Sequence, residues 1–328
     1  MMNLSSTDKN SSDGAWISAD PLGEVLHFLH MSGVFYTRSE LTAPWGIDLP
    51  PMPDCLMFHV ITSGDCWLKV EGSDSLLLHP GNFALVPHGK GHKLLSNPDQ
   101  SAINIFDLER EQVSERYEIL RHGKGGVSTN MICGAVRFDH PAAHQLMQLL
   151  PNIINIDIWR SPQMEWFQST LRLMAFEAGE LKPGGETIIT RLADILVIQA
   201  IRSWMAEDPA AKTGWLGALQ DKQIGRSIML IQRDPSQDWT VGSLASEVGM
   251  SRSSFAERFK QLVEKTPLQY ITWWRMNMAI KWLKEEDAPL SDLADRLGYQ
   301  SEAAFSRAFK KTIGVSPGSI RKNIKSRD

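Results

Sequence analysis

Two stretches in the last third of the chain share one pattern: LASEVGMSRSSFAERF at Leu244–Phe259 and LADRLGYQSEAAFSRAF at Leu293–Phe309. In each, Leu-Ala begins a short helix, and a glycine, Gly249 or Gly298, follows five residues after the leucine. Glycine tolerates the left-handed backbone that ends a helix, and a serine soon after it can cap a second helix. Each stretch therefore predicts a helix, a tight turn and a second helix, and the chain carries this unit twice.

The second helix of each unit has an apolar side and a polar side. Phe255 and Phe259, then Phe305 and Phe309, recur at the i, i+4 spacing of one helix face. A long amphipathic helix lies between the two units and begins at Pro267, a residue suited to the first helical position. Such a rigid spacer can hold two reading helices in successive major grooves on one face of DNA.

The region resembles the DNA-binding domain of the AraC/XylS family of transcription regulators. The matching segments are WTVGSLASEVGMSRSSFAERFK, TPLQYITWWRMNMA, LADRLGYQSEAAFSRAFKK and GVSPGSIRK, which follow one another with few gaps between Trp239 and Lys322. One departure is Ser319-Ile320 before Arg321, where the family usually has an aromatic residue. The resemblance implies a sequence-specific regulator that binds promoter DNA and works with RNA polymerase. Activation is the commoner outcome in this family, so we expect an activator, with repression as the alternative.

The polar faces of the second helices supply the candidate DNA contacts. Arg307 can make a bidentate contact with guanine, and Glu257 can accept a hydrogen bond from cytosine N4. Basic residues near them are better suited to phosphate, which positions a protein without specifying sequence. The candidate base-contacting residues are Ser253, Ala256, Glu257, Glu302, Ala303, Ser306 and Arg307. The candidate phosphate-contacting residues are Arg252, Lys260, Lys310, Lys311 and Arg321.

Length and charge fit two domains with different partners. The chain has 328 residues, which suggests two domains. Its net charge of −4 is uneven, because residues 220–328 hold 18 Lys and Arg against 13 Asp and Glu, and the rest holds 16 against 25. A basic C-terminal third suits phosphate binding, although a solvated charged surface would give the same totals. No run of eighteen apolar residues predicts a membrane span, and no signal peptide is evident, so we expect a cytoplasmic protein.

Residues from about Asp20 to Phe106 predict strands after one short helix at Leu22–Gly33. The apolar runs are short and separated by Gly, Pro, Asp or Ser, as in an antiparallel barrel or jelly roll. The segment GNFALVPHGKGH, Gly81–His92, is similar to the second sequence motif of the cupins. The N-terminal part thus resembles the cupin-like sensor domain of some AraC-family regulators. The expected fold is α+β: a cupin-like β-barrel (jelly roll), then helices, then an all-α domain with two helix-turn-helix motifs.

The cupin resemblance places the candidate signal site in the barrel. Catalytic cupins hold a metal with a His-x-His pair, a carboxylate and a further histidine. Here Val60-Ile61 follows His59, and Glu71 lies at another spacing, so we expect a small-molecule inducer, no metal and no enzyme. The alternatives are a metal-dependent cupin enzyme, in which His59 and His92 would bind metal with Glu71 or His88, and an adaptor that uses its helices for protein contacts. The candidate ligand pocket comprises Trp45, His59, Trp67 and His92.

The three cysteines leave two interpretations open. Cys55, Cys66 and Cys133 show no zinc spacing, and their odd number argues against a disulfide framework. A free cysteine is most often a small buried hydrophobe. An oxidant sensor would instead need an exposed thiolate of low pKa.

From Pro141 onward the pattern becomes helical. Pro162–Gly179 has a period near 3.6, with Trp166, Leu173 and Phe176 on one side, and the apolar run Gly184–Met205 follows. In relatives, helices after the barrel commonly form the dimer interface, so we expect a homodimer; packing on their own barrel is the alternative. The predicted division is a disordered N-terminus at 1–19, a sensor and dimerisation domain at 20–206, a linker at 207–220 and a DNA-binding domain at 221–328.

Overall fold

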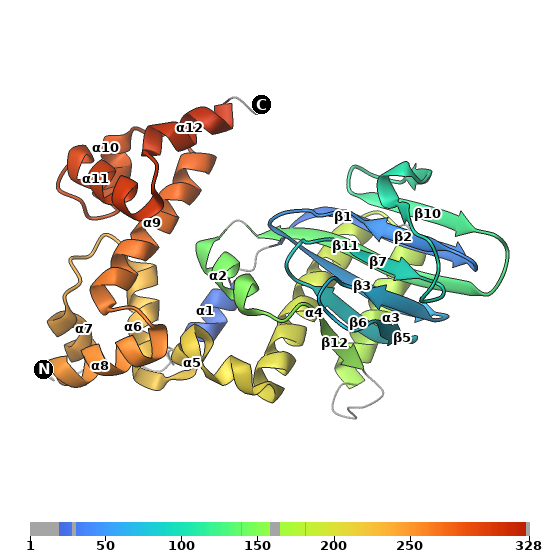
Figure 1. Ribbon diagram of the computed structural model, residues 1–328, viewed down its shortest axis with the longest axis horizontal. Coiled ribbons are helices and arrows are strands. Elements are labelled where there is room, and N and C mark those ends of the chain that lie inside the picture. The colour runs from blue at the N-terminus through green and yellow to red at the C-terminus, as the bar shows by residue number, and fades with distance from the viewer. Residues whose placement is uncertain (1–19, 28–30, 139, 158–164, 181, 326–328) are drawn as a thin grey trace, which may run out of the picture.

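The computed structural model describes residues 20–27, 31–138, 140–157, 165–180 and 182–325. The predicted disorder at 1–19 lies outside these residues. Strands dominate the first half of the chain and helices the second half (Figure 1). This order agrees with the α+β prediction. No helix in the described part of the chain is long and apolar enough to cross a membrane.

Two sheets face each other in the N-terminal half, in the manner of a jelly roll. The larger sheet has the order β12-β6-β3-β11-β1-β10-β9 and the smaller one β5-β4-β7-β2-β8. The strands of the larger sheet are β1 (Met31–Thr42), β3 (Cys55–Ser63), β6 (Asn82–Val86), β9 (Arg110–Gln112), β10 (Tyr117–Gly123), β11 (Ser128–Phe138) and β12 (Ile154–Asp157). Those of the smaller sheet are β2 (Gly46–Leu49), β4 (Cys66–Lys69), β5 (Leu76–Leu78), β7 (His92–Leu95) and β8 (Ile103–Asn104).

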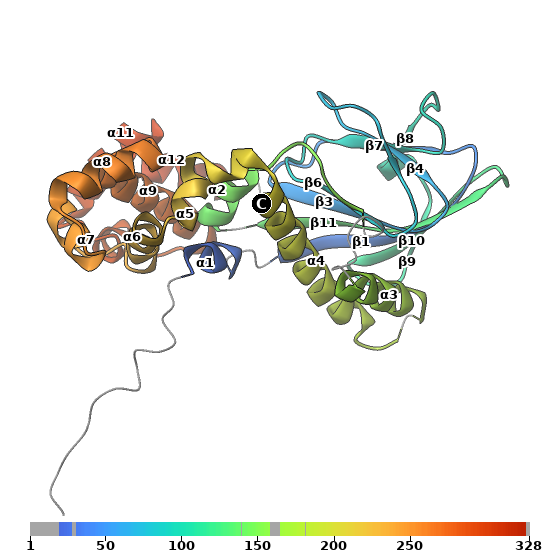
Figure 2. The same ribbon diagram turned by 90° about the horizontal axis from the view of Figure 1, so that it is seen from below.

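The larger sheet is buried on both faces. One face packs against the smaller sheet through Ile61 and Met131. The other packs against helices through Tyr36, Phe58 and Phe83. A strand buried on both faces loses its polar alternation, which explains the continuous burial of β3 from Cys55 to Ile61. Helices α3 and α4 cover this second face (Figure 2).

The predicted helix at Leu22–Gly33 is wrong at its C-terminal end. Helix α1 covers Pro21–His27, and β1 begins at Met31, so Gly33 lies in a strand. Strand β1 was not predicted separately from the sequence, although it pairs with both β10 and β11. Successive side chains of β1 point to opposite faces of the sheet. Tyr36 packs in the core under the helices, while Thr37 lines the space between the sheets.

Three helices follow the strands: α2 (Pro141–Leu149), α3 (Glu165–Glu180) and α4 (Gly185–Glu207). Helix α3 lies beside α4 and exposes Trp166, Leu173 and Phe176. The apolar side predicted from the sequence is therefore the outer side of α3. Its buried residues are Phe167, Leu171, Met174 and Ala178.

The segment expected as a linker, 207–220, carries a short 3-10 helix at Pro209–Lys212 and α5 (Gly214–Gln220). Helix α5 packs against α6 (Lys222–Arg233) and α8 (Arg252–Val263), so it contributes to the C-terminal core. The remaining helices are α7 (Val241–Glu247), α9 (Pro267–Glu285), α10 (Leu290–Arg296), α11 (Glu302–Ile313) and α12 (Pro317–Lys325).

Candidate nucleic-acid interface

The first helix-turn-helix unit consists of α7, a glycine turn and α8. A capping box holds the start of α7, where Thr240 and Ser243 each accept a hydrogen bond from the other's backbone N–H. Gly249 has a φ of 67° in the turn, and the hydroxyl of Ser251 caps α8 by accepting from the N–H of Ser254 at 3.2 Å. Phe255 and Phe259 then anchor α8 in the core. The predicted elements and their caps are confirmed.

The second unit repeats this construction with α10 and α11. Gly298 has a φ of 72°, and Ser301 caps α11 by accepting from the N–H of Ala304 at 3.2 Å. Phe305 and Phe309 are fully buried. Both second helices therefore point a phenylalanine pair inward, which turns the opposite face of each helix outward.

Helix α9 connects the two units and is fixed at its start. The side chain of Thr266 forms a capping box with Gln269. The buried hydroxyl of Tyr270 accepts hydrogen bonds from Gln232 Nε2 at 2.9 Å and Trp215 Nε1 at 3.3 Å. Burial raises the pKa of Tyr270 to about 12, so this hydroxyl keeps its proton. Helices α5, α6 and α9 are thus held together around one buried phenol. In Figure 1, α9 runs between the pair α7–α8 and the pair α10–α11.

The polar faces of α8 and α11 carry the predicted DNA-contacting residues. Ala256 and Ser306 are half-buried, and the other predicted base-contacting residues are exposed. No hydrogen bond or ion pair with another described residue engages the exposed cationic side chains of these two faces, which are Arg252, Lys260, Arg307, Lys310 and Lys311. Arg258 differs, because its Nε lies 3.0 Å from the Asp221 carboxylate at the start of α6. The outward faces therefore present cations that have no protein partner among the described residues.

Arg321 occupies a different position from the other predicted phosphate contacts. Its guanidinium donates to the backbone carbonyl of Ala288 and lies 4.0 Å from Asp287 Oδ1. Its side chain is mostly buried. These contacts tie α12 to the loop before α10, so the structure gives Arg321 a stabilising contact within the domain.

Of the four residues of the predicted ligand pocket, His59 and His92 form a buried pair. Trp45 and Trp67 are the two others. Thr37, Cys133 and His59 are paired neighbours on β1, β11 and β3. His59 Nε2 lies 2.7 Å from Nε2 of His92, which comes from the smaller sheet, and His59 Nδ1 lies 2.9 Å from Cys133 Sγ. The cavity beside these groups holds about 10 Å³, about the space of one water molecule. The space between the sheets is therefore filled by side chains.

The two tryptophans lie apart from each other. Trp45 is buried in the core between the sheets. Along β4, Cys66 and Leu68 belong to that core, whereas Trp67 does not. Because side chains alternate along a strand, Trp67 faces away from His59 and His92. The structure thus brings three of the four predicted pocket residues into one core.

The histidine pair lacks the remaining ligands of a catalytic cupin metal site. Among the described residues, no three His, Cys, Asp or Glu side chains are grouped to hold a metal. Glu71 is exposed, and His88 donates to the backbone carbonyl of Leu150 at 2.9 Å. Burial lowers the pKa of His92 to about 4 and lowers that of His59 as well, so both imidazoles are neutral at pH 7.

The cysteines are all buried in their reduced form. Burial raises the pKa of Cys66 to about 12 and raises that of Cys133. A neutral, enclosed thiol reacts slowly with oxidants, because the thiolate is the nucleophile. These environments favour the structural interpretation of the cysteines over oxidant sensing.

A groove that was not predicted from the sequence lies between the larger sheet and α3. Val60, Pro80 and Leu171 contribute to its walls, and Arg172 is its charged residue. Arg172 lies in a helix that was predicted, but only a structure shows that strands β3 and β6 approach its face. The sequence offered only Arg172 beside Leu171 as a signal, and α3 also carries Glu165, Glu177 and Glu180, so this arginine did not stand out.

Comparisons with known proteins cover nearly the whole chain. A family model described as Cupin matches residues 20–206, and one described as a helix-turn-helix domain matches residues 244–323. An AraC-like transcription regulator from Streptomyces lividans is 32% identical over 93% of this chain and 98% of its own length. The HTH-type transcriptional regulator AlkR from Acinetobacter baylyi is 28% identical over 92% and 99%, respectively. The RCS-specific HTH-type transcriptional activator RclR from Escherichia coli is 27% identical over 82% and 85%.

Proposed function

Because this chain belongs to the AraC-like family of transcription regulators, we propose that α8 and α11 are the helices with which it recognises promoter DNA. The observation that carries this assignment is the matched construction of the two helices. Each is capped by a serine and anchored by two buried phenylalanines, and each turns a polar face outward. A major groove admits an α-helix whose exposed side chains reach the base edges.

The base contacts come from the middle of these outward faces. In α11, Arg307 donates two hydrogen bonds to a guanine, and Glu302, Ala303 and Ser306 contact neighbouring base pairs. In α8, Glu257 accepts from a cytosine amino group, and Ser253 and Ala256 lie beside it on the same face. Arg252, Lys260, Lys310 and Lys311 bind phosphates and set the position of each helix. The side chains of these cations are exposed and form no hydrogen bond or ion pair with another described residue, which supports this division.

The experiment compares Arg307→Ala with Lys310→Ala on a library of DNA sites at several salt concentrations. Arg307→Ala relaxes the preference at one base pair by about 1–3 kcal/mol. Lys310→Ala weakens binding to all sequences alike and reduces the salt slope by about 1. Arg258→Ala is the matched control in α8, because Asp221 already engages this arginine. An unchanged sequence preference in Arg307→Ala contradicts the assignment.

We also propose that the chain forms a homodimer through the outer sides of α3 and α4. Large apolar side chains are exposed there, namely Trp166, Leu173, Phe176, Ile188 and Ile195. A cluster of exposed apolar residues marks an interaction surface, and most soluble oligomers are homodimers. Leu173→Asp is expected to yield monomers in sedimentation velocity, while Leu268→Asp, at an exposed leucine in α9, leaves the dimer intact. A dimer that persists in Leu173→Asp argues against this surface.

The regulator acts in the cytoplasm as an activator that works with RNA polymerase, and its N-terminal domain receives the signal. One similar protein is named an activator, which supports activation over repression. The relatives are named transcription regulators, and this chain matches them over almost their whole length. Both facts support a regulator over the metal-dependent enzyme. A promoter fused to a reporter tests the direction, since deletion of the gene lowers expression if the protein activates and raises it if the protein represses.

A further inference from the structure

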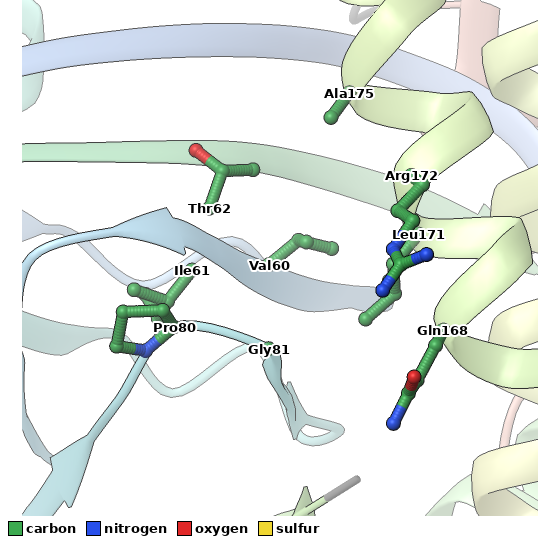
Figure 3. Close-up of a pocket in the computed structure, with 9 residues that line it drawn as sticks. All are labelled: Val60, Ile61, Thr62, Pro80, Gly81, Gln168, Leu171, Arg172 and Ala175. Carbon is green, nitrogen blue, oxygen red and sulfur yellow. The ribbon is translucent and has the colours of Figure 1, made fainter. Parts of the chain in front are cut away.

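A groove of about 200 Å³ runs between the larger sheet and helix α3. Figure 3 shows its two sides, with Val60, Ile61 and Pro80 on the strand side and Leu171 and Arg172 on the helix side. Pockets for drug-sized ligands usually hold about 300–1,000 Å³. The groove is therefore suited to a small molecule.

The walls of the groove are mostly apolar. Val60 and Ile61 come from β3, Pro80 precedes β6, and Leu171 and Ala175 lie one turn apart on α3. These residues share one face of the helix, distinct from the exposed outer side that carries Leu173. An apolar ligand body can thus enter the groove while the outer side of α3 remains free for the proposed dimer contact.

The charge of the groove comes from Arg172. Its side chain is exposed and makes no hydrogen bond or ion pair with another described residue. Gln168 lies one turn before it and adds an amide donor to the same wall. The neighbouring Arg38 is different, since it pairs with Glu40 at 2.8 Å and donates to the carbonyl of Ala178 at 3.0 Å. Arg172 is thus the guanidinium left available for a ligand.

We propose that this groove binds a small amphipathic carboxylate, with its apolar body between β3 and α3 and its carboxylate on Arg172. A guanidinium donates two parallel hydrogen bonds to a carboxylate, which fixes the orientation of the ligand. Gln168 donates a further hydrogen bond, and Val60, Pro80 and Leu171 cover the aliphatic or aromatic part. This assignment rests on the proposed sensing role of the N-terminal domain and names the ligand class and the site.

The groove is connected to the first reading helix by a series of packed helices. The ligand contacts α3, which packs along α4, and α4 packs on the 3-10 helix that precedes α5. Helix α5 in turn packs against α8, the first reading helix. A small rotation of α3 on the sheet therefore changes the support of α8, because these contacts form one continuous core.

The test is isothermal titration calorimetry of the full chain with sodium octanoate and with octan-1-ol, its neutral counterpart. Wild-type protein binds octanoate more tightly than octan-1-ol. Arg172→Gln lowers the affinity for octanoate about tenfold or more and leaves that for octan-1-ol unchanged. Arg191→Gln is the matched control, since Arg191 is also exposed, lies on α4 and pairs with Asp194. Ala175→Phe fills the groove and weakens both ligands.

Two results overturn the proposal: no heat of binding for octanoate below its micellar concentration, or equal octanoate affinity in wild type and Arg172→Gln. The unfolding midpoint of each variant is measured in parallel, and Arg172→Gln keeps the wild-type midpoint because its side chain is exposed. DNA binding is measured separately, with and without octanoate. Its failure under both conditions contradicts the proposed function, whereas failure of octanoate binding alone contradicts only the site.

Discussion

The two helix-turn-helix units follow one sequence pattern but are anchored in different cores. Phe255 and Phe259 of the first unit belong to a continuous apolar core that extends through α5 and α6 to the outer face of the larger sheet. Phe305 and Phe309 of the second unit belong to a separate, smaller core that they share with α9. The first unit is therefore packed as part of the N-terminal half, while the second is held by α9, by α12 and, at Gly298, by the backbone at Ser236.

The contacts of the first unit begin at the strands of the larger sheet. Helix α1 precedes β1 and packs against α5 and α6, and helix α2 follows β11 and packs against α9. Strands β1 and β11 pair along almost their whole length. Because the pairing is antiparallel, the start of β1 at Met31 lies opposite the end of β11 at Phe138, so a shift at this end of the strand pair is transmitted through both α1 and α2 to the helices that support α8. A repeated motif can thus carry different roles when only one copy shares a core with the sensor.

The largest expected effect separates the two cores. Phe259→Ala and Phe309→Ala each remove a fully buried ring, at a cost of about 3–5 kcal/mol. Phe259→Ala lowers amide protection in α5, α6 and α1 as well as in α8, because these helices share its core. Phe309→Ala lowers protection in α10–α12 and in the second half of α9. Hydrogen exchange followed by mass spectrometry measures both patterns.

The same experiment tests whether the two cores are independent. If Phe309→Ala lowers protection in α1 and α6 as much as Phe259→Ala does, the two cores unfold as one unit. Leu262→Ala is the control for a partly buried side chain on α8, and it produces a smaller change at the same positions.

The turn glycines give the next largest contrast. Both have a positive φ, so alanine at either position costs about 1–2 kcal/mol in backbone strain. A Cβ at Gly249 meets nothing within 4 Å, whereas a Cβ at Gly298 would lie 2.3 Å from the carbonyl oxygen of Ser236. Overpacking adds about 1–3 kcal/mol, so Gly298→Ala destabilises more than Gly249→Ala. Urea denaturation measures the difference. Equal midpoints would show that the backbone at Ser236 can move away from the added Cβ at little cost in free energy.

The sequence predicted the C-terminal domain almost element by element, because glycine turns, serine caps and paired phenylalanines are local signals. It predicted the jelly roll from short apolar runs, yet β1 was not singled out, since polar residues occupy both of its faces: Thr37 and Ser39 are buried, whereas Arg38 and Glu40 are only partly buried. The exposed side of α3 was recognised as apolar, but the groove at Arg172 was not, because it depends on the approach of β3 and β6. Local sequence patterns likewise could not predict that α1 and α2 contact the C-terminal helices.

The smallest expected effect concerns the contact between α2 and α9. His140 caps α2, its Nδ1 accepts from the N–H of Ala142 at 3.3 Å, and its ring lies 5.6 Å from that of Trp274 in α9. Burial, followed by the nearby charges of Lys281 and His144, lowers the pKa of His140 from 6.5 to about 3. The unfolded chain therefore binds this proton first, so the stability that neutral His140 contributes is present above about pH 6.5 and is lost as the pH falls toward 3.

Between pH 7 and pH 5 this loss amounts to about 2 kcal/mol from His140 alone. His140→Asn retains a capping oxygen and cannot be protonated, so its free energy of unfolding falls by about 2 kcal/mol less than that of wild type over the same range. His59 and His92 have the same sign of dependence and are present in both proteins, so the difference between the two isolates His140. Urea denaturation at the two pH values measures it. Parallel pH profiles would mean that His140 is protonated without disturbing α2.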